Sequence, residues 1–208
     1  MAINIMAYPP GGGGNHLKNL LELNGWFCDQ WPWPWVREQR VGLAPYDRPP
    51  GPPGEVHSLP GRNIHAVFVD HVSQHPHGDY LLHGHFGELA AHADQIRTWT
   101  DVRWLVQTMD DQQDRDLLRQ RQHRLAYHPY WQDEEQIFMY RPEMYRRYFG
   151  ADPARICVLP VRLLWQRDIV ASGVLEILQT AFDTVIDQQA AQDLHSKWCD
   201  LNFGPTVV

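Results

Sequence analysis

Apolar and polar residues along the chain follow two spacings, one typical of strands and one typical of helices. Short apolar runs over 3–8, 63–70, 79–86, 101–109 and 155–161 each predict a strand, the last of them buried. Apolar residues recur every three or four positions from Leu17 onward and again over 141–150, 168–182 and 187–202, whereas 110–128 is polar, with spaced arginines and a few apolar anchors (Leu117, Leu118 and Leu125). These later segments predict helices, and Gly150 is expected to close the third of the five.

The order of these elements predicts the fold class. Strands that alternate with helices indicate an α/β protein, a three-layer sandwich built on a mostly parallel sheet. Ligands of such sheets bind beyond the carboxyl ends of the strands. The segment that follows the first strand is therefore the first place to look for a site.

That segment contains four consecutive glycines, Gly11 to Gly14, placed between the first strand and the first helix. Asn15 is a good N-cap residue, so we expect the helix to begin there. The first N–H groups of a helix have no partner within it and lie at the positive end of its dipole, and glycine lets an anion approach them closely. The sequence favours an anion-binding loop here, and a merely flexible connection is the alternative.

Length and composition limit the classes of protein that remain. A chain of 208 residues, 43% of them hydrophobic, is expected to form one domain over 1–208. The net charge of −7 argues against general nucleic-acid binding, although all but two of the 18 basic residues are arginine, which suits phosphate or sulfate. Three cysteines without metal spacing, no signal peptide and no membrane-length apolar run predict a cytoplasmic protein.

A segment rich in tryptophan, proline and glycine occupies about 31–63. Its prolines exclude regular helix and central strand, so it predicts a long loop inserted in the domain. Its tryptophans either anchor this loop to the core or stack on a ligand.

Several stretches in this order resemble the sulfotransferase family. AYPPGGGGNHLKNLL (7–21) is similar to the family's phosphosulfate loop, and LLHGHFGEL (81–89) resembles its strand that ends in Thr-His-Leu. VRWLVQTMDDQQDRDLL (102–118) and ICVLPVRLLWQRDIVASGVLEILQTAF (156–182) stand where the family has its next strand and helix and its late strand and helix. The chain resembles, more loosely, proteins encoded by bacteriophages of aquatic bacteria.

The resemblance implies a P-loop-type fold and transfer of a sulfuryl group from phosphoadenosine phosphosulfate to a hydroxyl or amine of a small-molecule or glycan acceptor. It implies that His85 is the catalytic base, with His83 as the neighbouring alternative. It also implies a cradle for the donor's 5′-phosphosulfate, formed by Gly11, Gly12, Gly13, Gly14, Asn15 and His16. Gly11 stands where the family usually has Lys or Arg, and Lys18 is the nearest cation that compensates.

Two departures from the family pattern keep other functions open. The family's 3′-phosphate ligands, Arg and Ser, fall on Thr108 or Met109 and on Asp116. Nearby arginines (Arg115, Arg119 and Arg121) either supply charge or form a solvated helix face. A chain without a working donor site would be a non-catalytic binding or assembly protein.

A metal enzyme is the third hypothesis. The segment 71–88 is rich in histidine and contains two H-x-H pairs, whose imidazoles share one face of a strand. Its potential ligands are His71, His75, His77, His83, His85 and Glu88. A single catalytic base among surface histidines is the interpretation that we prefer.

Overall fold

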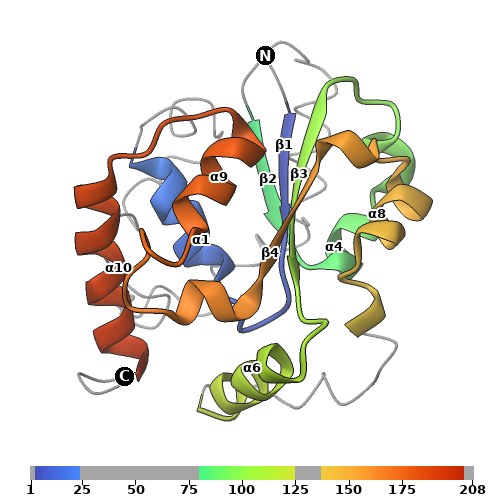
Figure 1. Ribbon diagram of the computed structural model, residues 1–208. Helices are drawn as coiled ribbons and strands as arrows, with labels where there is room; N and C mark the ends of the chain where they lie inside the picture. Colours follow the sequence, from blue (N-terminus) through green and yellow to red (C-terminus); the bar gives the residue numbers. More distant parts are fainter. Residues whose placement is uncertain (1–2, 24–79, 125–136, 204–208) are drawn as a thin grey trace, which may run out of the picture.

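The computed structural model describes residues 3–23, 80–124 and 137–203 (Figure 1). The strand expected over 63–70, the Trp-Pro loop over 31–63, and His71, His75 and His77 lie outside these residues. None of the helices in the described ranges combines the length and the apolar character that crossing a membrane requires.

The described residues contain four parallel strands that form one sheet. They are β1 (Ile3–Ala7), β2 (Tyr80–Gly84), β3 (Val102–Thr108) and β4 (Ile156–Pro160), and their order across the sheet is β2-β1-β3-β4. Ile5 of β1 pairs with Leu82 on one side and with Trp104 on the other. Every residue of β1 is buried, as expected for the central strand of a covered parallel sheet. The predicted α/β class with a parallel sheet is confirmed.

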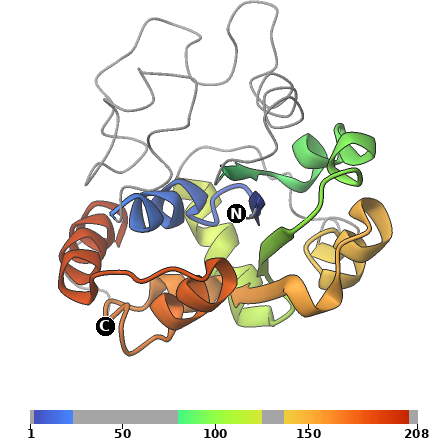
Figure 2. The same ribbon diagram turned by 90° about the horizontal axis from the view of Figure 1, so that it is seen from above.

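Helices lie on both sides of the sheet (Figures 1 and 2). One side carries α1 (Gly14–Glu22), α9 (Val174–Phe182) and α10 (Gln188–Phe203), and the other carries α4 (Phe86–Ala90), α5 (Ala93–Ile96) and α8 (Pro142–Phe149). Helix α6 (Gln112–Arg124) lies beyond the carboxyl ends of the strands, and two short 3-10 turns, η1 (Pro153–Arg155) and η2 (Val161–Trp165), flank β4.

Aromatic packing fixes α8 against the sheet. Trp104 of β3 lies with its ring centroid 5.3 Å from that of Tyr145 and 5.0 Å from that of Phe149, and all three side chains are buried. Phe86, at the start of α4, contacts the same two α8 rings edge-on. This cluster forms the core on one side of the sheet and holds the start of α4 next to the end of β2.

Three sequence predictions need correction. Helix α1 begins at Gly14 with Gly13 as its N-cap, not at Asn15, because Gly13 adopts the left-handed conformation that ends the loop. Helix α9 begins only at Val174, since Gly173 is also left-handed and interrupts the apolar spacing over 168–182. Strand β4 lies at the edge of the sheet, and Val158 is 39% exposed where a buried strand was expected.

The strand order places two turns side by side at the carboxyl edge. The chain runs from β1 to β2 on one side and then crosses to β3 on the other, so the order reverses between β1 and β3. Such a switch point is where open α/β sheets bind ligands. The glycine loop follows β1, and the turn Met109–Asp111 follows β3.

A buried carboxylate ties this edge together. Asp114 of α6 accepts hydrogen bonds from the backbone N–H of Arg162 at 2.7 Å and from its guanidinium at 2.8 Å. Burial raises the pKa of Asp114, while both bonds from Arg162 act in the opposite direction. The pair joins the segment after β4 to the helix after β3, so the elements around the switch point are held as one unit.

Candidate functional site

The glycine loop is a tight turn that passes directly into α1. The N–H of Gly12 donates to the carbonyl of Pro9 at 2.8 Å, and the N–H groups of His16 and Leu17 donate to the carbonyl of Gly13. Gly11 and Gly13 have φ of 81° and 85°, in the left-handed region that side-chain-bearing residues rarely adopt. At these two positions the backbone conformation itself requires glycine.

Close packing gives a second reason for the glycines. A Cβ on Gly12 would lie 2.3 Å from Oε1 of Gln107, and one on Gly14 would lie 2.2 Å from the ring of Tyr8. A Cβ on Gly13 would lie 2.7 Å from Leu164. The expectation that glycine lets an anion approach is therefore incomplete, because side chains of the protein itself fill the space beside three of the four glycines.

The N-terminus of α1 differs from those of the other helices in the described ranges. Its first turn has no acidic residue, and Gly13 supplies no side-chain cap. Each of the others has either an acidic first-turn residue (α4, α5, α6, α8 and α9) or, in α10, an N–H of Ala190 bonded to the carboxylate of Asp187. Among the hydrogen bonds of the described residues, none is donated by the N–H of Gly13 or Gly14. Within 3–23, 80–124 and 137–203, the positive end of the α1 dipole therefore has no compensating acidic group or cap.

Gln107 of β3 joins the two turns of the switch point. Its side chain is fully buried, and its Nε2 donates to the carbonyl of Gly12 at 2.8 Å. Its Oε1 has no hydrogen-bond partner in the described part of the chain and is directed at the loop. Gln107 therefore holds the backbone of Gly12 from the side of the loop that protein side chains fill.

The two candidate bases lie on the other side of Tyr8. His83 is in β2, and its Nδ1 is 2.9 Å from the hydroxyl of Tyr8. His85 follows β2 as the N-cap of α4, and its Nδ1 is 2.9 Å from the carbonyl oxygen of Tyr8. Tyr8 therefore contacts both imidazoles, while its ring also packs on Gly14.

The surroundings of His85 determine which ring nitrogen carries its proton. A carbonyl oxygen only accepts, so Nδ1 of His85 must be the N–H that donates to Tyr8. In the neutral ring Nε2 then has a lone pair, and the capping box of α4 directs the backbone N–H of Glu88 at the same side chain. The carboxylate of Glu88 accepts the backbone N–H of His85 at 2.8 Å and fixes the residue in place. This is the form in which an imidazole acts as a general base.

His16 is placed differently from what the resemblance implies. Its imidazole is buried, stacks on Trp198 at a centroid distance of 4.4 Å, and has Nε2 2.9 Å from Nδ1 of His195. The side chain is therefore engaged with α10, away from a role in a phosphosulfate cradle. Lys18 lies further along α1 and is half-buried.

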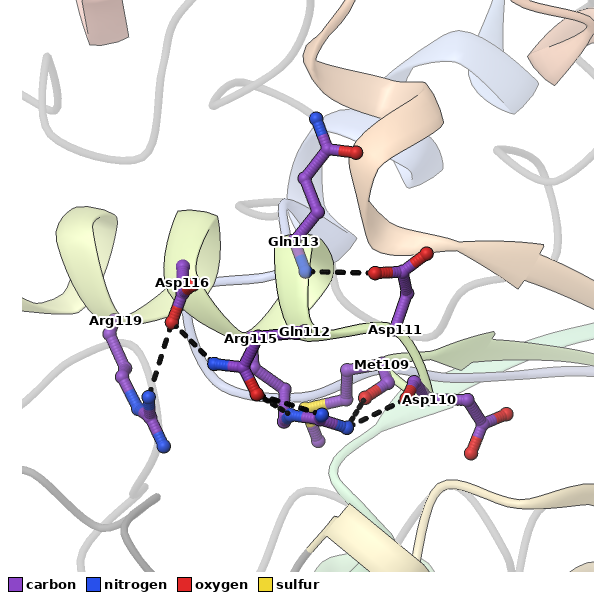
Figure 3. Close-up of polar contacts among 8 residues, drawn as sticks. All are labelled: Met109, Asp110, Asp111, Gln112, Gln113, Arg115, Asp116 and Arg119. Carbon is purple, nitrogen blue, oxygen red and sulfur yellow. Dashed lines mark hydrogen bonds and ion pairs between the residues drawn. The ribbon is translucent and has the colours of Figure 1, made fainter.

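Arginines near the expected 3′-phosphate position are engaged within α6 and the turn before it. Figure 3 shows Arg115 donating to the carbonyls of Met109 and Asp110 and to the side chain of Gln112. Arg119 pairs with the carboxylate of Asp116 at 3.2 Å. Both arginines hold the turn and the helix, which fits the interpretation of a solvated helix face.

Metal ligation has limited support in the described ranges. No group of three or more His, Cys, Asp or Glu side chains there is arranged to hold a metal ion. His83, His85 and Glu88 belong to the described residues, whereas the other three potential ligands of the histidine-rich segment lie outside them.

Sequence reasoning did not identify Tyr8, Gln107 and His195 as parts of this site. Gln107 left a signal, since it is a polar residue inside an otherwise apolar strand. His195 lies on the apolar stripe of α10 together with Trp198 and Cys199. The contacts of Tyr8 with the two histidines bridge more than 70 residues, and no local pattern reveals them.

Comparisons with models of known protein families, with curated protein sequences and with solved structures find no match. The class of protein defined so far is therefore an α/β protein with a parallel sheet and a glycine loop at its switch point.

The packing of Gly13 predicts that even alanine is costly there. Gly13→Ala combines left-handed strain with overlap against Leu164, so we expect the free energy of unfolding to fall by about 3 kcal/mol. Gly87→Ala is the matched control, because that helical glycine has open space around it and its substitution should be neutral or stabilising by up to about 1 kcal/mol. Urea unfolding of both variants checks this, and equal effects would contradict the packing described.

Stability should also depend on the protonation of His195. Burial is the main cause that lowers the pKa of this imidazole in the folded protein. Below the unfolded pKa of about 6.5, the unfolded chain binds a proton that the folded chain does not, so stability falls as pH decreases from there toward the folded pKa. Wild type should lose more stability between pH 7 and pH 5 than His195→Asn, which has no such group. Parallel loss in both proteins would contradict a buried neutral imidazole.

Proposed function

We propose that the chain binds an anionic nucleotide at the glycine loop and transfers its sulfuryl group to a hydroxyl or amine acceptor. Phosphoadenosine phosphosulfate is the donor that the sulfotransferase resemblance implies. The single observation that carries the proposal is the N-terminus of α1, which has no acidic first-turn residue and no side-chain cap and lies at the switch point between β1 and β3. N–H groups without a partner among the described residues and the helix dipole together favour a phosphate or sulfate group at this position.

The chemistry follows from the position of His85. Nε2 of His85 accepts the proton of the acceptor hydroxyl as its oxygen bonds to sulfur, while the bond between sulfur and the phosphate oxygen breaks. The electron pair stays on the leaving phosphate, whose charge the N-terminus of α1 stabilises. The carbonyl of Tyr8 holds Nδ1–H and favours the imidazolium that forms.

One observation favours a second candidate, a non-catalytic protein. Side chains of the chain itself contact Gly12, Gly13 and Gly14, so the glycine run has a structural reason to exist without a ligand. In that case the loop is only a tight connection between β1 and α1. The two candidates differ in whether the N–H face of the loop binds an anionic nucleotide.

A negative charge added to the first turn of α1 distinguishes the nucleotide-binding candidate from the non-catalytic one. Asn15→Asp adds a negative charge to the first turn of α1, which repels an anion at this helix end, so it should weaken binding of adenosine 3′,5′-bisphosphate at least roughly tenfold while raising stability by about 0.5 kcal/mol through the helix dipole. Asn19→Asp carries the same charge one turn further along α1 and should change affinity far less. Calorimetric titration of the three proteins measures this, and absence of binding to wild type would favour the non-catalytic candidate.

The tautomer of His85 tests its role as the base. Long-range ¹H–¹⁵N spectra above pH 8 should show Nδ1 of His85 protonated and Nε2 bare, because the carbonyl of Tyr8 selects this form. Protonation at Nε2 instead would leave the accessible nitrogen without a lone pair. That result would remove His85 from the proposed reaction, whatever the loop binds.

A further inference from the structure

Helix α10 contacts the first turn of α1 through a column of buried rings. His16, the third residue of α1, stacks on Trp198 with an interplanar angle of 6°, and its Nε2 is 2.9 Å from Nδ1 of His195. His16 and His195 are 1% and 0% exposed. Polar groups this deep in the protein are positioned by their hydrogen bonds.

The carbonyl oxygen of Gln166 determines which atom donates in each hydrogen bond of His195. Nε2 of His195 is 2.7 Å from the carbonyl oxygen of Gln166, which can only accept, so Nε2 carries the hydrogen. Nδ1 of the neutral ring is then an acceptor, and His16 donates to it from Nε2. Cys199 Sγ lies 3.3 Å from Nε2 of His195, and Asp168 is the charged group whose field acts on the ring.

Helix α10 and the 3-10 turn η2 also contact the glycine loop. Leu164 of η2 and Trp198 of α10 lie 2.7 Å and 3.3 Å from the position of a Cβ on Gly13. Trp198 thus touches Gly13 on one side and His16 on the other. The left-handed turn at Gly13 and the first turn of α1 rest on one surface, formed by η2 and α10.

We propose that His195 is a positioning residue of the glycine loop: by holding His16 it fixes the first turn of α1 and the direction of the N–H groups of Gly13 and Gly14. The link to ligand binding rests on the proposed function, whereas the positioning is a property of the free protein. A helix from the end of the chain then sets the geometry of a site at its beginning, 179 residues away in sequence.

Two substitutions of His195 each keep one of its two hydrogen bonds and remove the other. In His195→Asn, the amide oxygen can take the place of Nδ1 and accept from His16, while the bond to Gln166 is lost. In His195→Gln, the amide nitrogen can take the place of Nε2 and donate to Gln166, while His16 loses its acceptor. Each variant loses one buried hydrogen bond, so the pair is matched in the kind of contact removed.

Amide hydrogen exchange in the free protein is the first measurement. The N–H groups of His16 and Leu17, which bond to the carbonyl of Gly13, should exchange at least tenfold faster in His195→Gln and within threefold of wild type in His195→Asn. Equal acceleration in both variants, or none in either, would overturn the proposal. Should His195→Gln not fold, exchange in wild type decides: the first turn of α1 must open together with α10, and earlier opening of α10 alone would overturn the proposal.

Titration with adenosine 3′,5′-bisphosphate is the second measurement. His195→Gln should bind it roughly tenfold more weakly than wild type, and His195→Asn should bind within threefold. If wild type does not bind, the proposed function fails, while the exchange data still decide the positioning role. If all three proteins bind equally, the loop does not depend on His195 and the inference is overturned.

Discussion

The left-handed turn at Gly13 is the constraint on which the candidate site depends. It ends the loop after β1 and begins α1, and a Cβ on Gly13 would lie 2.7 Å from Leu164, closer than Cβ atoms approach, and 3.3 Å from Trp198. The side chains of Gln107 and Tyr8 pack in the same way against Gly12 and Gly14. Because the protein fills the Cβ side of the loop, only its N–H side is left for chemistry, and there the dipole of α1 has neither an acidic first-turn residue nor a side-chain cap.

The strand order turns this local feature into a candidate site. With β1 between β2 and β3, the loop lies beside the end of β3 and also beside the end of β2, where His83 and His85 contact Tyr8. The N-terminus of α1, which has no acidic first-turn residue, and the imidazole of His85 therefore lie on either side of one tyrosine. The proposed transfer of a sulfuryl group from an anionic donor would use both of these features.

Local patterns in the sequence were enough to predict most of the described helices and strands. The apolar runs gave β1 and β3, and the spacing in α10 and the terminal Gly150 of α8 gave those helices, because burial and capping act over a few residues. The starts of α1 and α9 were missed, since both depend on a left-handed glycine whose conformation is decided by what packs on it or by the turn that it ends. The exposure of β4 was missed because an apolar run does not reveal whether its strand lies at an edge.

The candidate site was predictable only in part, for a related reason. The glycine loop and His85 stood out by residue type and position. The resemblance implied that His16 belongs to the donor cradle, and the contact of its side chain with His195, 179 residues further along the chain, had no signal in the local sequence. The roles of Tyr8 and Gln107 likewise arise from contacts between different strands, and such contacts exist only once the sheet is formed.

The central claim is that the N–H face of the glycine loop binds an anionic nucleotide. Its most direct test is to follow the backbone amide signals of Gly11, Gly12, Gly13 and Gly14 by NMR during addition of adenosine 3′,5′-bisphosphate. The account predicts saturable shifts that are largest at Gly13 and Gly14, whose N–H groups have no partner among the described residues. Shifts confined to other parts of the chain, or no shifts at all, would contradict it.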